Sequence, residues 1–230
     1  MRGLDHQQVR SFQQRLLRWY ARHGRDLPWR HTRDPYRILV SEVMLQQTQV
    51  ERVIEYYGRF LEKYPTIESL AESAEPQVRE AWDGLGYYAR ARNLHRTARQ
   101  VTMELGGELP QDAQLIRRLP GIGRYTAGAV LSFAYGKDAA ILDTNAARVL
   151  SRVFGVRRRG SKARFMTRLW KIAEAATPRG RADRYNQAIM DLGATVCRAR
   201  TPSCWRCPVK KDCRSALPNG NDGGRPSRLP

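Results

Sequence analysis

Apolar side chains recur along most of the chain at intervals of three and four residues, which places them on one face of an α-helix. One such series joins the following positions: Val43, Gln47, Val50, Ile54, Tyr57 and Leu61. Later series contain Leu115 and Leu119, and then Ala129, Leu131 and Phe133. A sustained alternation of apolar and polar residues, the mark of a half-buried strand, is missing. The pattern therefore predicts an all-α protein.

Clusters of Gly, Pro and polar residues interrupt this helical pattern and divide the chain into about ten short helices. The interruptions fall at residues 25–28, 64–66, 106–111, 120–123, 136–138, 155–161 and 177–180. The last segment, residues 215–230 (SALPNGNDGGRPSRLP), is rich in Pro, Gly and Asn and has few side chains to pack. We expect this tail to be disordered.

The composition favours a folded protein that binds a polyanion. Hydrophobic residues make up 41% of the 230 positions, enough for a packed interior. The 41 Lys and Arg against 22 Asp and Glu give a net charge of +19. Such an excess attracts polyanions, of which nucleic acid is the commonest. The charge alone leaves open a ribosome-associated protein or an origin in an Arg-rich proteome.

The sequence also bears on location. It has no run of about 18 apolar residues that could span a membrane, and the first ten residues lack the apolar core of a signal peptide. We therefore expect an intracellular (cytoplasmic, nucleoid-associated) monomer with no membrane partner. Structural disulfides rarely persist in such a reducing compartment.

Four cysteines lie close together near the end of the chain, at Cys197, Cys204, Cys207 and Cys213, with the spacing C-x6-C-x2-C-x5-C. In a reducing compartment this arrangement indicates thiolate ligation of a metal. Zinc and a [4Fe–4S] cluster both accept four cysteines. Zinc sites usually show two separated Cys pairs, so a single loop with one C-x2-C favours the cluster, in a structural role. Unligated cysteines are the third alternative.

Residues 115–135 (LIRRLPGIGRYTAGAVLSFAY) predict two helices joined by a glycine turn. Gly121 and Gly123 allow a tight turn and the close approach of a ligand to the backbone. The first amides of the second helix then favour an anion such as phosphate. The alternative is a plain helical hairpin with glycines for its turn. Further along, ILDTN contains Asp143, which by itself is best interpreted as a helix N-cap, with Thr144 as the other candidate.

The hairpin LPGIGRYTAGAV, the downstream ILDTN and the cysteine quartet, in this order, resemble the endonuclease III superfamily of helix-hairpin-helix DNA glycosylases. Within it, DLPWR (26–30), SEVMLQQTQV (41–50), GLGYYARARNL (84–94) and NQAIMDLGATVC (186–197) are similar to the MutY-type adenine DNA glycosylases. The resemblance covers about residues 16–213. It implies two lobes with a DNA-binding cleft between them. A six-helix lobe, 28–136, would carry the hairpin, and 1–27 with 137–214 would carry a C-terminal [4Fe–4S] cluster loop.

The resemblance also implies roles for individual residues. Glu42 would protonate the departing adenine, and Asp143 would stabilise or capture the sugar cation, with Tyr125 and Asn145 positioning both. The residues implied to probe the duplex and fill the space of the flipped base are Gln46, Gln47, Thr48, Gln49 and Tyr88. Those implied to contact DNA through the hairpin are Leu119, Gly121, Gly123 and Arg124.

The chemistry of base removal is consistent with these roles. An oxocarbenium-like transition state calls for one protonated and one ionised carboxyl group. Glu42 lies in an apolar segment (ILVSEVML), where desolvation would raise its pKa. The alternative interpretation of Glu42 is that it lies in the first turn of a helix, where the helix dipole favours a negative charge. Flipping the base costs a few kcal/mol. Tyr88 and Gln47, a planar and an amide side chain, suit the space that the flipped base leaves. The alternative is that they are an ordinary packing residue and an ordinary polar residue of the surface.

Tyr125 stands where lyase-competent relatives carry a lysine that forms a Schiff base with the sugar. Tyrosine has no amine, so we expect a monofunctional glycosylase that leaves an abasic site. MutY-type enzymes usually continue into a domain that reads 8-oxoguanine, and we expect that domain to be absent. Thr144 replaces their usual glycine.

The substrate is therefore open between two bases. Adenine opposite 8-oxoguanine or guanine is favoured by LQQTQV and GLGYYAR. The alternative is thymine or uracil from T:G and U:G mismatches, because a short relative with tyrosine at this position removes thymine. A non-catalytic DNA-binding paralogue is disfavoured by the presence of both Glu42 and Asp143. A structural zinc protein that binds nucleic acid is a further alternative.

Overall fold

The structure, a computed structural model, describes residues 4–216, and all regular structure in this range is helical, with no strand. The all-α prediction is therefore confirmed. Most of the predicted disordered tail, residues 217–230, lies outside the described residues. Ser215 and Ala216 donate backbone hydrogen bonds to the carbonyls of Arg152 and Cys213. No helix formed by residues 4–216 is both long and apolar enough to cross a membrane.

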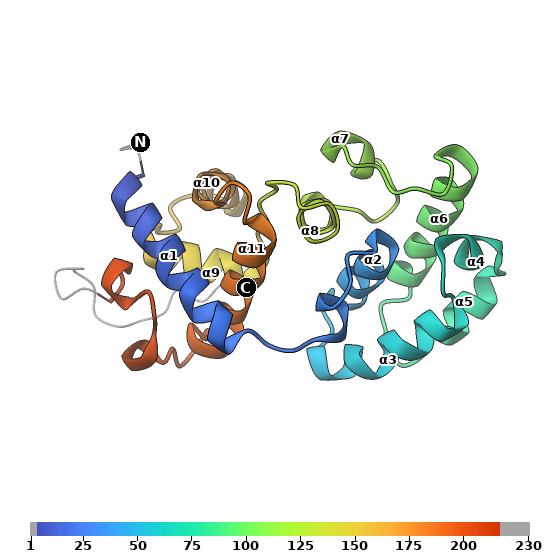
Figure 1. Ribbon diagram of the computed structural model, residues 1–230, viewed down its shortest axis with the longest axis horizontal. Helices are drawn as coiled ribbons and strands as arrows, with labels where there is room; N and C mark the ends of the chain where they lie inside the picture. The colour runs from blue at the N-terminus through green and yellow to red at the C-terminus, as the bar shows by residue number, and fades with distance from the viewer. Residues whose placement is uncertain (1–3, 217–230) are drawn as a thin grey trace. The chain divides into compact units, whose positions relative to one another are not determined.

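The chain divides into two compact units. One is Asp26–Tyr135, and the other joins, among the described residues, 4–25 with 136–216. The first unit is fully described and holds a 3-10 turn and seven α-helices (Figure 1). In order they are Pro28–Arg30, α2 (Pro35–Met44), α3 (Val50–Lys63), α4 (Ile67–Glu72), α5 (Glu75–Ala81), α6 (Ala89–Glu104), α7 (Ala113–Ile116) and α8 (Arg124–Phe133). The family resemblance implied six helices for residues 28–136, and α7 is a single turn.

Polar side chains start several of these helices. The carboxylate of Asp34 accepts hydrogen bonds from the amides of Tyr36 and Arg37, with Pro35 at the first position of α2. Thr66 begins α4 with a capping box, and Asp112 caps α7. These caps satisfy amides that have no acceptor within their own helix.

The predicted continuous apolar face from Val43 to Leu61 is wrong. The chain leaves the helix after Met44 and begins α3 at Val50, so the helical phase is reset. The buried face of α3 is formed by Val53, Tyr57 and Phe60, whereas Ile54 is 41% exposed. Phe60 packs edge-on against Trp82, with ring centroids 5.7 Å apart, and this contact anchors α3 in the core of the unit.

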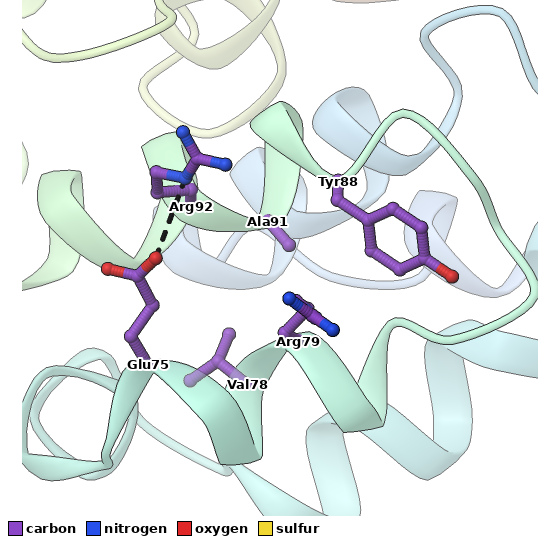
Figure 2. Close-up of a pocket in the computed structure, with 6 residues that line it drawn as sticks. All are labelled: Glu75, Val78, Arg79, Tyr88, Ala91 and Arg92. Carbon is purple, nitrogen blue, oxygen red and sulfur yellow. Dashed lines mark ion pairs between the residues drawn. The ribbon is translucent and has the colours of Figure 1, made fainter.

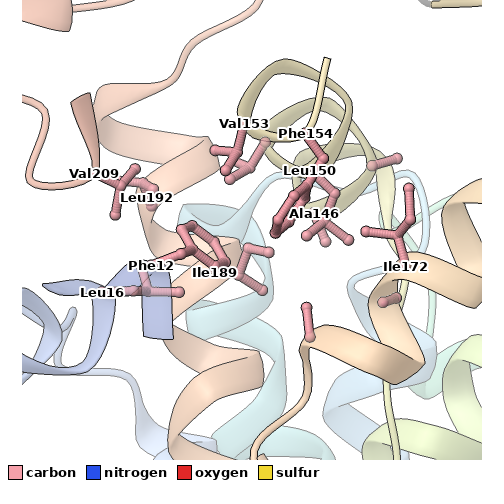
Figure 3. Packing of buried hydrophobic residues seen from close by; sticks show 14 of the residues in the cluster. Phe12, Leu16, Ala146, Leu150, Val153, Phe154, Ile172, Ile189, Leu192 and Val209 are labelled. Atoms are coloured by element: carbon pink, nitrogen blue, oxygen red, sulfur yellow. The ribbon is translucent and has the colours of Figure 1, made fainter. Parts of the chain in front are cut away.

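The second unit combines the first helix with the last part of the chain. It contains α1 (His6–His23), α9 (Thr144–Val153), α10 (Lys162–Ala176), α11 (Ala182–Asp191), a π-helical turn Leu192–Val196, and two 3-10 turns, Cys204–Arg206 and Lys210–Asp212. Phe12 of α1 packs edge-on against Phe154 (Figure 3), and it also packs edge-on against Tyr185. Burying one such side chain stabilises a fold by about 1.5–3 kcal/mol. The same cluster includes Val209, which ties the cysteine loop to this core.

Candidate functional site

Glu42 lies in the last turn of α2 and is 3% exposed. The alternative interpretation, a first-turn residue favoured by the helix dipole, is therefore wrong. The C-terminal end of a helix carries partial negative charge, and burial removes the hydration that stabilises a carboxylate. Both features disfavour the ionised form of this side chain.

The turn that follows, residues 45–49, holds four of the predicted DNA-contacting residues. Gln46 is half-buried, and its side-chain amide donates to Thr126 Oγ1 at 3.4 Å. Gln47 and Gln49 are exposed, and Thr48 is half-buried. Gln47 has a φ of 58°, a left-handed conformation that non-glycine residues rarely adopt. The turn thus presents an exposed amide side chain on a strained backbone.

A second turn, residues 84–88, precedes α6. The hydroxyl group of Tyr88 donates to Asp83, and this hydrogen bond raises the pKa of Tyr88. Its side chain borders a pocket of about 50 Å³ between α5 and α6 (Figure 2). The other lining residues are Glu75, Val78, Arg79, Ala91 and Arg92. Pockets for small-molecule ligands start at roughly 300 Å³, so this one has room for water and not for a base.

The neighbouring Tyr87 was not singled out from the sequence. It has a φ of 49° and is 60% exposed, against 39% for Tyr88. Two adjacent tyrosines have the same chemistry, and only the backbone conformation distinguishes them. The more exposed aromatic ring of this turn therefore belongs to Tyr87.

The hairpin joins α7 to α8, and its two glycines serve different needs. Gly121 has a φ of +75°, and a Cβ there would lie 2.8 Å from Cβ of Asn93. Gly123 caps α8 and has open space around a Cβ position. Leu119 is buried, so its side chain packs within the unit and any DNA contact must come from its backbone.

The beginning of α8 is suited to an anion. Gly123 supplies no side chain to cap the helix, so the first amides of α8 lack a side-chain acceptor at this position. Arg124, the first residue of α8, is exposed and adds a positive charge, while Tyr125 beside it is half-buried. This combination is typical of phosphate-binding helix N-termini.

Asp143 belongs to the other unit and caps α9, which confirms its interpretation as an N-cap. One carboxylate oxygen accepts from the amide of Ala146 at 2.6 Å, and the other accepts from the side-chain amide of Asn145 at 3.0 Å. Thr144 is the first helical residue and is exposed. The two hydrogen bonds hold the carboxylate in one orientation, so capping and a chemical role are compatible.

Arg148 extends this arrangement and was missed from the sequence, where it is one of many cations. Its Nη2 donates to Asn145 Oδ1 at 2.6 Å and to the carbonyl of Gly193 at 2.8 Å, and its Nε donates to the carbonyl of Cys197 at 2.8 Å. A Cβ on Gly193 would lie 2.6 Å from Cβ of Asn145, so glycine is required there. A continuous chain of hydrogen bonds therefore runs from Asp143 to the first cysteine.

The cysteine loop is attached to the core by several contacts. Arg152 donates from Nη1 to Cys197 Sγ at 3.3 Å and to the carbonyl of Arg198 at 2.8 Å. Gln8 of α1 donates to the carbonyl of Asp212 at 2.7 Å. These contacts place the loop without any disulfide among the described cysteines, whose thiols are all free.

The four thiols do not form a ready-made metal site in the described residues. Within residues 4–216, no three Cys, His, Asp or Glu side chains are grouped so as to hold a metal ion. Burial raises the pKa of Cys207 to about 11 despite a backbone hydrogen bond from Val209, and the other three cysteines add to the increase. A shared cation stabilises the deprotonated form of thiols that otherwise raise one another's pKa. The donor set therefore fits a thiolate-bound metal or cluster.

Known proteins resemble this chain over most of its length. A family model described as HhH-GPD superfamily base excision DNA repair protein matches residues 40–175. The adenine DNA glycosylase of Homo sapiens is 44% identical over 92% of this chain and 40% of its own length. That of Buchnera aphidicola (Baizongia pistaciae) is 42% identical over 90% of this chain and 59% of its own length. The chain thus spans about half the length of these relatives.

Solved structures show the same fold. A thermostable thymine-DNA glycosylase is 34% identical, with a TM-score of 0.83, over 91% of this chain and 97% of its own. An endonuclease III trapped in a covalent intermediate with DNA is 26% identical, with a TM-score of 0.79, over 93% and 98%. The resemblance inferred from the motifs is confirmed, and the chain belongs to the HhH-GPD superfamily of base excision DNA repair proteins.

Proposed function

We propose that this protein is a monofunctional DNA glycosylase that hydrolyses the N-glycosidic bond of adenine mispaired with 8-oxoguanine or guanine. The contrast between two carboxyl groups supports it most directly. Glu42 is buried at the negative end of a helix, whereas Asp143 accepts two hydrogen bonds at the positive end of another. Two carboxyl groups in contrasting environments are what an oxocarbenium-like transition state calls for. The relatives named adenine DNA glycosylase favour adenine as the base.

In the proposed reaction Glu42 donates a proton to a ring nitrogen of the flipped adenine. The C1′–N bond breaks, its electron pair leaves with the base, and the sugar becomes an oxocarbenium-like cation. The carboxylate of Asp143, oriented by Asn145 and by the amide of Ala146, stabilises that cation. Water then adds at C1′ and loses a proton. Because Tyr125 offers no amine, the product is an abasic site.

Double-stranded DNA is the proposed partner, bound by a monomer. Phosphate would contact Gly121, Gly123 and Arg124 at the start of α8, where amides and positive charge coincide. Gln47, Thr48 and Gln49 would probe the duplex from the turn after α2, supported by Gln46. Tyr87 is the more exposed ring for the vacated space, and Tyr88 lines the α5–α6 pocket.

We also propose that Cys197, Cys204, Cys207 and Cys213 hold a [4Fe–4S] cluster, with zinc as the alternative. A bound cluster would be held by these four cysteines and would tie the loop to the α9–α11 core. Purified protein should then be brown and carry about four irons per chain. Cys207→Ser should remove the colour and lower the melting temperature. Colourless protein that contains zinc instead would contradict the cluster.

Thymine is the second candidate base. The solved thymine-DNA glycosylase is 34% identical to this chain, with a TM-score of 0.83. Thr144, next to Asp143, is the departure from the MutY-type pattern that this alternative would explain. The substrate would then be thymine or uracil opposite guanine.

Single-turnover base excision on five duplexes separates these candidates: A:8-oxoguanine, A:G, A:C, T:G and U:G, each with and without alkali. We expect strand cleavage of the A-containing duplexes, and only after alkali, because the abasic product needs alkali to break. Excision confined to T:G and U:G would establish the thymine alternative. Strand cleavage without alkali would contradict the monofunctional mechanism, and binding with no excision on any duplex would leave a non-catalytic paralogue.

A further inference from the structure

The second residue of α6, Arg90, is a buried guanidinium group that donates to five backbone carbonyls. It is 8% exposed. Nη1 and Nη2 donate over 2.5–3.1 Å to the carbonyls of Val43, Met44, Gln46, Leu85 and Gly86. Three of these acceptors lie at the end of α2 and in the turn after it, and two lie in the turn before α6. One side chain therefore joins two turns that are about 40 residues apart in sequence.

Each of these two turns contains a residue in the left-handed conformation. Among residues 4–216, Gln47 and Tyr87 are the two non-glycine residues with positive φ. Such conformations cost of order 1–3 kcal/mol each and persist where the surroundings hold them. The guanidinium lies between the two turns and also faces the ring of Tyr87, 5.4 Å from its centroid. Arg90 thus contacts the ring of Tyr87 and the carbonyl of Gln46, the residue that directly precedes Gln47.

The electrostatics of Arg90 indicate a role beyond packing. In the described residues no carboxylate pairs with it, and its Nε has no hydrogen-bond partner. Burial lowers its pKa from the ordinary value. Burying a charged group in this way is costly, and an apolar side chain would fill the space more cheaply. The compensation comes from carbonyls at the negative end of α2 and from the faces of Trp82 and Tyr87.

We propose that Arg90 is a positioning residue that fixes the turns 45–49 and 84–88 as one rigid element, so that Gln47 and Tyr87 are presented to the duplex together. The proposal rests on the proposed function for what the two side chains do. Neither turn can relax without breaking hydrogen bonds to the same guanidinium. Holding both side chains in place before binding reduces the ordering cost of replacing a flipped base.

The first test measures the turns without any substrate. Arg90→Lys keeps the charge but replaces a planar fork of five donors by an ammonium group, which cannot reach both sets of carbonyls. We expect amide hydrogen exchange to increase in 45–49 and in 84–88 together. Arg99→Met, an exposed position on the same helix, is the control and should change neither turn. Exchange that increases in one turn alone, or in neither, would overturn the proposal.

The second test separates positioning from general loss of structure. Single-turnover excision is measured for adenine paired with 8-oxoguanine and for adenine opposite an abasic site, where flipping costs less. Arg90→Lys should lower the first rate at least about tenfold, equivalent to about 1.4 kcal/mol in the barrier, and the second by less than about threefold. Equal losses on both substrates in folded protein would show a structural role only.

If wild-type protein excises no base, the proposed function fails while the exchange experiment still decides the role of Arg90. The Arg90→Met variant provides a second comparison if it folds. If it does not fold, the Arg90→Lys variant alone provides the test.

Discussion

Asp143→Asn should lower the rate of single-turnover base excision by roughly 10²–10⁴-fold and leave duplex affinity and the melting temperature nearly unchanged. The substitution removes the negative charge that would stabilise the sugar cation. It keeps an amide oxygen that can accept from the amide of Ala146, as the carboxylate does now. Asparagine is as good an N-cap as aspartate, so α9 should retain its start.

The matched control for this variant is Asp5→Asn. Asp5 caps α1 in the same unit, and its carboxylate accepts from the amide of Gln7. The control makes the same chemical change at a helix N-cap, so excision should proceed at the wild-type rate. If Asp143→Asn instead loses both excision and binding while melting normally, Asp143 acts in DNA binding. If excision persists, Asp143 is a helix cap and nothing more.

The parts of the fold that depend on local sequence could be predicted. The helical period, the glycine hairpin and the N-cap at Asp143 follow from residues within a few positions of one another. The helical phase of α3 relative to α2 could not be predicted. The left-handed Gln47 interrupts the helix, and no neighbouring residue requires that conformation. The hydrogen bond that the turn accepts at the carbonyl of Gln46 comes from Arg90, more than 40 positions away in sequence.

The candidate site shows the same division. The cysteines could be selected because their spacing is distinctive, and the two carboxyl groups because the motifs around them resemble those of DNA glycosylases. Arg90 and Arg148 could not be distinguished from the other arginines of a +19 chain, because their roles come from carbonyls supplied by distant segments. Tyr87 and Tyr88 are equivalent in sequence, and only the backbone of the turn assigns exposure to one of them.

Glu42→Gln should also lower excision of adenine by roughly 10²–10⁴-fold, because glutamine has nearly the same shape but cannot donate an acidic proton. A neutral amide in this buried position should leave the melting temperature close to that of wild type. Glu51→Gln, an exposed position in the first turn of α3, is the control and should excise normally.

The acid role of Glu42 has a further consequence that Asp143 does not share. An adenine already methylated at a ring nitrogen, such as 7-methyladenine, leaves as a neutral base without receiving a proton. Glu42→Gln should therefore recover much of its rate on a duplex that contains this base, whereas Asp143→Asn should not, because the sugar cation still needs its counter-charge. Equal recovery in both variants would show that the two carboxyl groups share one role, and no recovery in either would remove Glu42 as the proton donor.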